Sequence, residues 1–302
     1  MLLSKKTQKI NRIFPITYLV FLIGLTGSGW PFIFGENPNK VLLKTDLKKD
    51  SQQTVFYELE AEAEVTIPMY LKHAPMKLYS RLQRETKQTI LAVEKNNITK
   101  VRREYVSSKI FLRKNNPQPR PDPLDQKNLT IEEKDNQINI TGVISPHLQS
   151  TIFPNENNYA LFLPGKPVVV GEQWSVPEAD VLEILNFAGS KQRQVYHNCT
   201  EIGIKARFEK GTMSCTFKEI KKLEAADYAV IEMQGTLAGE DNGLNVEITL
   251  TGEGLFNIRL KKIIKVELKG DIKMAGDQPC LLPGQTTQVT GGGTLSFKIE
   301  FK

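Results

Sequence analysis

Residues 244–250 read LNVEITL, and every second side chain is apolar: Leu244, Val246, Ile248 and Leu250. Successive side chains of a β-strand point to opposite faces, so this period of two predicts a strand with one apolar face. Asn242-Gly243 precedes the run, and this dipeptide between two alternating segments is a strong signal for a tight hairpin. The stretch therefore predicts antiparallel strands with one buried and one wet face.

Other segments repeat this alternation. Residues 258–268 (IRLKKIIKVEL) are apolar at every second position apart from Lys262: Ile258, Leu260, Ile264, Val266 and Leu268. Residues 295–301 (LSFKIEF) and 56–67 (FYELEAEAEVTI) alternate in the same way, and further strands are expected near Lys77–Val93 and Ile98–Leu112. The fold class predicted is mainly β: a large antiparallel curved sheet, half-barrel or sandwich with one short amphipathic helix.

The helix is expected in residues 177–189 (PEADVLEILNFAG). Pro177 suits a first helical turn, acidic residues follow it, and Gly189 can end the helix. Val181, Leu182, Leu185 and Ala188 fall on one side, so the helix is expected to pack on the sheet.

Four glutamates share one face of the strand at 56–67: Glu58, Glu60, Glu62 and Glu64. Four carboxylates in a row suggest a calcium site or a basic partner. The simpler interpretation is a solvated face that pairs with cations of a neighbouring strand, for which Arg81, Arg84 and Lys87 are candidates.

The N-terminal segment has the layout of an export signal. A basic stretch, KKTQKINR, is followed by an uncharged apolar run from Ile13 and by the small residues of TGSG. We predict a signal peptide over 1–29, or an anchor retained to about residue 34, because the uncharged run is long enough to span a bilayer. A flexible tether (30–52) and an antiparallel β domain (53–302) follow. The protein is expected to be exported, periplasmic or extracellular, and to meet a membrane only through this segment.

Charge and cysteines narrow the partners. Four of the 40 Lys and Arg residues lie within the first twelve positions, which leaves 36 against 34 Asp and Glu residues. A nearly neutral remainder gives no reason to expect a nucleic-acid partner. Export would allow a disulfide between Cys199 and Cys215 that leaves Cys280 free, and three unpaired thiols are the alternative.

Residues 113–127 (RKNNPQPRPDPLDQK) carry a proline at every second position from Pro117 to Pro123. Such a segment favours extended polyproline geometry and cannot donate a full ladder of hydrogen bonds. It is predicted to be an exposed loop or an interdomain linker. The sequence leaves open whether the strands on its two sides form one sheet or two domains.

No motif indicates catalysis. Residues 161–174 (LFLPGKPVVVGEQW) contain Gly165-Lys166, but Pro167 and three valines follow where a phosphate loop would open a helix. The stretch is therefore interpreted as scaffold, with Trp174 as a core anchor, and Gly291–Gly293 as a flexible turn before a strand. The three histidines accompany no G-x-S-x-G or Cys-x-x-Cys motif. We predict that the protein is not an enzyme and holds neither cofactor nor metal.

The same stretch resembles a phrase, LP-x-KPV-x-VG-[DE]-x-W, of uncharacterised exported bacterial proteins with a large all-β domain. Matching parts follow at Thr216–Ile220, Ala229–Gly235 and Leu268–Met274, so the likeness covers roughly residues 160–275. Glu172 stands where Asp is more usual. The resemblance implies export and β architecture, and it transfers no catalytic residues.

Two hypotheses of function result. The first is binding of an apolar or lipid-like ligand in a β half-barrel. Its lining would be Leu182, Leu185, Val246, Ile248, Leu250, Ile264, Val266 and Leu268. The alternative is a non-catalytic cell-envelope module that binds a protein through the proline-rich loop and the acidic strand face.

Overall fold

Long antiparallel strands dominate the computed structural model, which describes residues 40–66, 75–114, 118–135, 137–142, 154–185, 207–224, 226–241, 243–279 and 286–302. The first half contains β1 (Val41–Leu42), β2 (Gln52–Thr66), β3 (Met76–Glu94), β4 (Asn97–Phe111), β5 (Arg120–Pro121), β6 (Asn128–Lys134) and β7 (Gln137–Thr141). A short 3-10 helix, η1 (Tyr159–Phe162), then precedes β8 (Pro167–Val168), β9 (Gln173–Ser175) and the helix α2 (Glu178–Ile184). The chain ends with β10 (Arg207–Leu223), β11 (Ala226–Asp241), β12 (Leu244–Asn257), β13 (Lys262–Pro279) and β14 (Thr286–Phe301).

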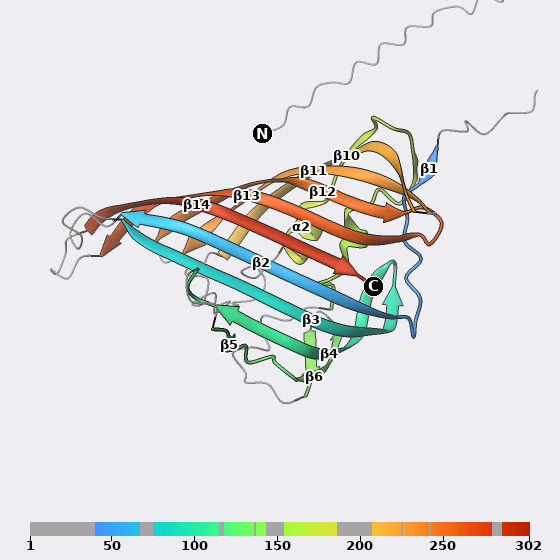
Figure 1. Ribbon diagram of the computed structural model, residues 1–302, viewed down its shortest axis with the longest axis horizontal. Coiled ribbons are helices and arrows are strands. Elements are labelled where there is room, and N and C mark those ends of the chain that lie inside the picture. Colours follow the sequence, from blue (N-terminus) through green and yellow to red (C-terminus); the bar gives the residue numbers. More distant parts are fainter. Residues whose placement is uncertain are drawn as a thin grey trace, which may run out of the picture. The chain divides into compact units, whose positions relative to one another are not determined.

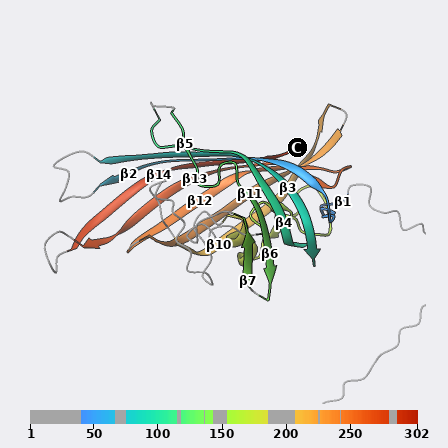
Figure 2. The same cartoon turned by 90° about the horizontal axis from the view of Figure 1, so that it is seen from below.

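One twisted sheet contains nearly all of these strands (Figures 1 and 2). Its order is β7-β6-β4-β3-β2-β14-β13-β12-β11-β10-β9, with β5 paired to β4, and β1 and β8 form a separate pair. Every pairing is antiparallel. The strands before and after the proline-rich loop therefore belong to the same sheet, and the predicted curved antiparallel sheet with one short helix is confirmed.

The two faces of the sheet differ in polarity, as the alternation predicts. We call inner the face that carries Leu59, Leu268 and Phe297, each at most 3% exposed. This face forms one apolar cluster from β10 to β14 and β2, and a second cluster gathers on β3, β4 and β6 around Val101 and Ile131. The outer face carries Thr, Lys, Glu and Ser side chains at the alternate positions. Removal of apolar surface from water is thus concentrated on one side of the sheet.

The predicted hairpin and helix are present. Two residues connect β11 to β12, with Gly243 at a φ of 85° as a tight hairpin turn requires. In α2, Val181 and Ile184 are buried and Leu182 packs partly buried against the apolar cluster. The helix ends at Ile184, before the expected Gly189, and residues 186–206 lie outside the described residues.

One expected strand begins later than the alternation indicates. Residues 258–261 form the turn between β12 and β13, and Leu260 is 55% exposed. The Leu260 N–H donates to Asn257 Oδ1 at 2.8 Å, and Lys261 adopts a φ of 51°. An Asn side chain that accepts from the backbone competes with the ladder in this way, and it sets the start of β13 at Lys262.

Two segments expected to be free are instead attached. Within the predicted tether (30–52), β1 pairs with β8, and Leu43 is fully buried because its apolar side chain gains by leaving water. Within the proline-rich loop, Arg120 and Pro121 pair with β4, and Leu124 is buried in the second apolar cluster. The predicted exposed loop therefore folds back onto the sheet.

The segments predicted as signal peptide or anchor, 1–29 or 1–34, lie outside the described residues. In the part of the chain that the structure describes, no helix is long and apolar enough to cross a membrane.

Gly291–Gly293 lie inside β14, so their interpretation as a turn is wrong, and they give a matched pair of test sites. A Cβ on Gly293 would clash with the Glu62 carbonyl oxygen, whereas one on Gly292 would meet its nearest atom, the Ile272 carbonyl oxygen, at 3.4 Å. We expect Gly293→Ala to lower the free energy of unfolding by about 2–3 kcal/mol through overpacking. Gly292→Ala is expected to change it by less than about 1 kcal/mol. Urea denaturation of both variants checks this, and equal losses would contradict the close strand contact.

Candidate functional site

The inner face collects most of the side chains predicted to line a ligand site. Val246, Ile248, Leu250, Val266, Leu268 and Leu185 are buried members of one apolar cluster, and Leu182 packs against it. Ile264 differs, because β12 and β13 slip by one residue between Leu255 and Phe256. Ile263 takes the buried position there, while Ile264 is the extra, half-buried residue of a bulge. Seven of the eight predicted residues are thus brought together, packed against one another.

In the described part of the chain, residues 154–185, which we call the strap, cover this face together with Val41 and Leu43 of the N-terminal segment. Near the start of the strap, Tyr159 stacks on Phe297 of β14, with ring centroids 5.8 Å apart, and meets Phe301 edge-on at 6.1 Å. Tyr159 also packs edge-on against Phe162 at 5.7 Å. Burial raises the pKa of Tyr159 well above its ordinary value, so its hydroxyl stays neutral. These aromatic contacts hold η1 on the apolar cluster.

The C-terminal part of the strap, which contains β9 and α2, is joined to β10. β9 pairs with β10 from Ser214 to Thr216, and Val181 and Leu182 of α2 lie over Gly211. The Trp174 indole N–H donates to the Phe162 carbonyl at 2.8 Å. The predicted role of residues 161–174 as scaffold with Trp174 as an anchor agrees with these contacts.

The N-terminal part of the strap, residues 154–157, is held to β3 and β4 by polar contacts. Asn155 Oδ1 accepts from the Ile98 N–H at 3.0 Å, and the Asn157 amide donates to Gln88 Oε1 at 3.4 Å. The guanidinium of Arg103, fully buried, donates to Glu156 at 2.8 Å and to the Pro154 carbonyl at 2.9 Å. The strap therefore crosses the inner face from a polar attachment on β3–β4 to β10.

A second arginine extends this buried polar cluster. Arg84 donates to Asp122 Oδ2 at 2.7 Å and lies 3.7 Å from Glu156. Asp122 also accepts from the Ser108 hydroxyl at 2.6 Å and from the Leu124 N–H at 3.0 Å. Each arginine thus has a carboxylate partner, which a charge removed from water requires.

The pKa values of the cluster reflect burial and pairing. Burial alone would raise the pKa of Asp122, but Arg84, Ser108 and the Leu124 amide favour the carboxylate and bring the pKa below its usual value. Burial raises the pKa of Tyr105 to about 12, and Glu156 acts in the same direction. Asp122 is accordingly charged and Tyr105 neutral at physiological pH.

Sequence reasoning missed this cluster, although a signal for it exists. Val101, Arg103 and Tyr105 share a face by their period of two, as do Thr86, Gln88 and Ile90. A cation at an inward position of an alternating strand is unusual, because a buried charge needs a partner. The period-two alternation could have placed Arg103 on the inner face of the sheet. It could not have identified its partners Pro154 and Glu156, which are more than fifty residues away in the sequence.

The four glutamates of β2 lie on the outer face and face cations. Arg81 Nε lies 2.9 Å from Glu58, Lys77 lies 3.1 Å from Glu64, and Lys114 bonds Glu62 at 2.6 Å. The expectation of a cross-strand partner is confirmed for Arg81. It is wrong for Arg84, which points to the inner face, and Lys87 lies 3.9 Å from Glu104 instead.

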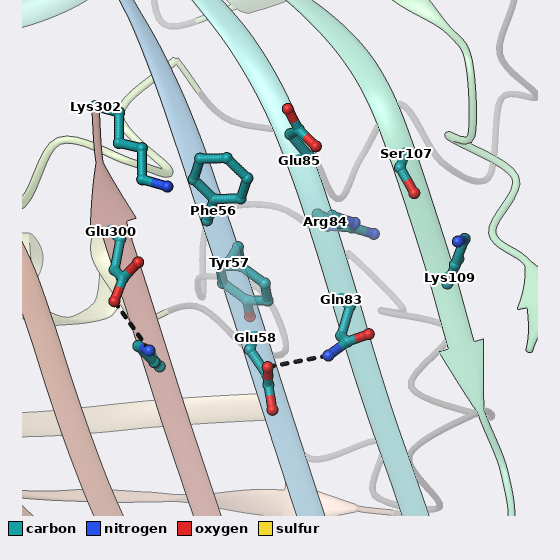
Figure 3. Close-up of a pocket in the computed structure, with 11 residues that line it drawn as sticks. Phe56, Tyr57, Glu58, Gln83, Arg84, Glu85, Ser107, Lys109, Glu300 and Lys302 are labelled. Atoms are coloured by element: carbon teal, nitrogen blue, oxygen red, sulfur yellow. Dashed lines mark hydrogen bonds and ion pairs between the residues drawn. The ribbon is translucent and has the colours of Figure 1, made fainter. Parts of the chain in front are cut away.

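A shallow outer groove of about 360 Å³ crosses β14, β2, β3 and β4 (Figure 3). Phe56 and Glu58 line it together with Lys109, Lys298 and Glu300. Its acids and cations are mixed, and Lys298 bonds Glu300 at 2.9 Å. A groove without a dominant charge gives little basis for recognising a charged ligand.

The predicted disulfide is not tested, because Cys199 lies outside the described residues. Cys215 is buried in the apolar cluster, and burial raises the pKa of its thiol to about 12. His73, His147 and His197 also lie outside the described ranges. Within those ranges, no group of three His, Cys, Asp or Glu side chains is arranged to hold a metal.

No protein-family model matches the chain, and no match to a curated protein was found. Among solved structures, the chain is similar to one described as lipid-protein interactions in lipovitellin, with a TM-score of 0.37 and 8% identity. That similarity covers 85% of this chain and 25% of the lipovitellin chain. An outer membrane channel from Pseudomonas putida F1 has a TM-score of 0.18 and 7% identity over 86% of this chain and 98% of the channel. Both TM-scores are below 0.5, so the description of the chain as a large antiparallel β-sheet protein rests on its own strand pairing.

Replacing the buried cation Arg103 tests whether the polar cluster attaches the strap to β3 and β4. We expect Arg103→Met to lower the free energy of unfolding by about 3–5 kcal/mol, because it leaves Glu156 without its shortest ion pair. Lys100→Met, on the same strand, removes a more exposed pair with Glu132 and should cost less than about 1 kcal/mol. Denaturant titrations of the two variants compare these losses. A small effect of Arg103→Met would show that the cluster does not hold the strap.

The lowered pKa of Asp122 gives the fold an acid dependence. The carboxylate contributes stability that is fully present above its unfolded pKa, about 3.9, and is lost as the pH falls through the lower folded-state value. The wild type should therefore be more stable than Asp122→Asn near pH 6, and the difference should shrink as the pH falls below about 4. Burial alone would lower the pKa of Arg84, the cation that faces Asp122, but Asp122 and its other neighbours raise it, so Arg84 keeps its proton in this range. Urea unfolding at several pH values checks this, and a constant difference would contradict it.

Proposed function

We propose that the protein is an exported, non-enzymatic binder of an apolar or lipid-like ligand, which it holds on the inner face of its sheet. The observation that carries the proposal is the continuous apolar face of six adjacent strands, β10 to β14 and β2. The buried side chains of this cluster are at most 7% exposed, so an apolar molecule held against them would also be removed from water.

The dimensions of the strap and the sheet support this proposal. Strands of 14 to 18 residues extend roughly 45–60 Å, at about 3.3 Å per residue. The helical parts of the strap comprise four residues in η1 and seven in α2. Val65 lies eight residues, or roughly 26 Å, along β2 from Tyr57, the β2 residue nearest the aromatic contacts of η1. We place the ligand at the end of the sheet around Val65, Val246 and Met274, whose side chains are 6%, 1% and 5% exposed.

The packing of the predicted lining refines the first hypothesis. Ile248, Leu250 and Leu268 are at most 2% exposed and contact one another within the cluster. The ligand is accordingly proposed to lie over this face beside the strap, not in a cavity between these side chains.

Export is proposed from the N-terminal sequence alone. The basic, apolar and small-residue segments before residue 30 are typical of a secretory signal. An extracytoplasmic location is compatible with a carrier of apolar molecules, which are poorly soluble outside membranes.

The alternative, an envelope module that binds a protein, has less support. The acidic face of β2 is matched by Lys77, Arg81 and Lys114, and part of the proline-rich loop is paired with β4. Both surfaces named for a partner are thus engaged within the chain.

Native mass spectrometry of the exported protein, purified without detergent, tests the proposal. We expect a reproducible added mass that organic solvent extracts, and a polypeptide mass that lacks about 29 residues. Met274→Gln, at the proposed end of the inner face, should lower ligand occupancy about tenfold, because a buried amide opposes an apolar ligand. Lys273→Gln, its neighbour on the outer face, is the control and should leave occupancy unchanged. A bare mass, with no binding of added lipid, would overturn the proposed function.

A further inference from the structure

The buried polar cluster contains hydrogen-bond donors that bond to no acceptor in the described part of the chain. Arg103 Nε, Gln88 Nε2 and Tyr105 Oη are buried, and none meets a described partner at hydrogen-bond geometry. Burial raises the pKa of Tyr105, and Arg103 lies near enough to the Tyr105 oxygen to act in the opposite direction, which leaves the Tyr105 O–H and the Gln88 amide as the free donors. Arg103 and Gln88 are fully buried, and Tyr105 is 2% exposed. A buried donor left without an acceptor is costly, and native proteins rarely keep several together without a reason.

The three donors are neighbours on the inner face. Gln88 lies directly opposite Arg103 in the register of β3 and β4, and Thr86 lies opposite Tyr105. Residues in register on antiparallel strands share a face, with Cβ atoms about 4.5–5.5 Å apart. One small acceptor can therefore be reached from both strands.

Charge indicates the class of that acceptor. Both guanidinium groups already have carboxylates, because Arg103 bonds Glu156 at 2.8 Å and Arg84 bonds Asp122 at 2.7 Å. Asp125 adds a further acid, whose Oδ1 accepts from the Ser108 N–H at 2.6 Å. An additional anion would be buried without a counter-charge, whereas a neutral carbonyl or hydroxyl oxygen would use the free donors at no such cost.

The position of the cluster connects it to the apolar face. It lies where the strap leaves β3–β4, directly before Tyr159 packs on β14. The side chains of Arg84 and Glu156 are 19% and 24% exposed, so the cluster is closed at Arg103 and reaches the surface at this pair. A molecule along the inner face would meet apolar side chains first and the free donors at its end.

We propose that Gln88, Arg103 and Tyr105 form a binding site for the neutral oxygen-bearing end of an amphipathic ligand, such as an ester or an alcohol. This inference rests on the proposed function and makes it more specific: the ligand is uncharged at its polar end, and a free fatty acid anion is disfavoured.

Three probes with the same apolar chain test this class: dodecane, methyl dodecanoate and dodecanoate. Binding to the full chain is measured by displacement of a fluorescent apolar dye. We expect the ester to bind at least about tenfold more tightly than the alkane and more tightly than the carboxylate. Equal binding of ester and alkane, as when only a water occupies the site, would overturn this inference and leave the proposed function standing. Binding of none of the probes would overturn both.

Two variants locate the effect. Tyr105→Phe removes a hydroxyl that donates to no described group and keeps the ring, which lies 5.9 Å from the Arg84 guanidinium carbon. We expect it to remove the preference for the ester while alkane binding, which reports an intact fold, stays unchanged. Tyr79→Phe makes the same chemical change on the outer face of β3 and should keep the preference. An unchanged preference in Tyr105→Phe would contradict the assignment of the site.

Discussion

The burial of one face of six adjacent strands is the constraint on which this structure depends. Side chains alternate across a strand, so a slip by one residue would expose the whole apolar set, and the register is strongly specified. Local fit adds to this. Gly270 lies opposite Leu250 and Leu295, and a Cβ on it would meet Leu250 and Ile248 at 2.9 Å. Small residues thus provide room for the large ones on neighbouring strands, and the apolar face packs in one register only.

The same constraint makes the inward charges of β3 and β4 costly. Arg84 points inward between Tyr57 of β2 and Ser108 of β4, and Arg103 between Gln88 of β3 and Leu129 of β6. Each buried ion needs several kcal/mol of compensation. Their partners come from residues 122 and 154–156, outside the regular strands. A pair of apolar residues could stabilise the sheet as well, but it would not specify where the strap begins. We infer that these charges determine the path of the strap across the sheet.

The fold could be predicted from the sequence further than the site could. Alternation in β2, β12 and β14 predicted their faces correctly, because a period of two is a local property that burial on one side enforces. The alternation did not reveal the turn at 258–261, because Ile258 and Leu260 continue the apolar pattern although Asn257 ends the strand. The buried cluster could not be derived, because its partners meet only through long-range pairing. The alternation places Arg103 on the inner face, but it does not predict that Pro154 and Glu156 contact it.

The arrangement of surfaces along the inner face has a consequence for the kind of molecule it suits. The large apolar cluster spans β10 to β14 and β2, and the second covers β4, β6 and the last part of β3. Arg84, Thr86 and Gln88 form a polar interruption on β3 between them. A purely apolar molecule would gain nothing at this interruption, and a charged one would find no free counter-charge. An uncharged molecule with one polar end fits this order of surfaces, because its apolar part would contact the apolar cluster and its polar end would contact the polar side chains of β3 and β4.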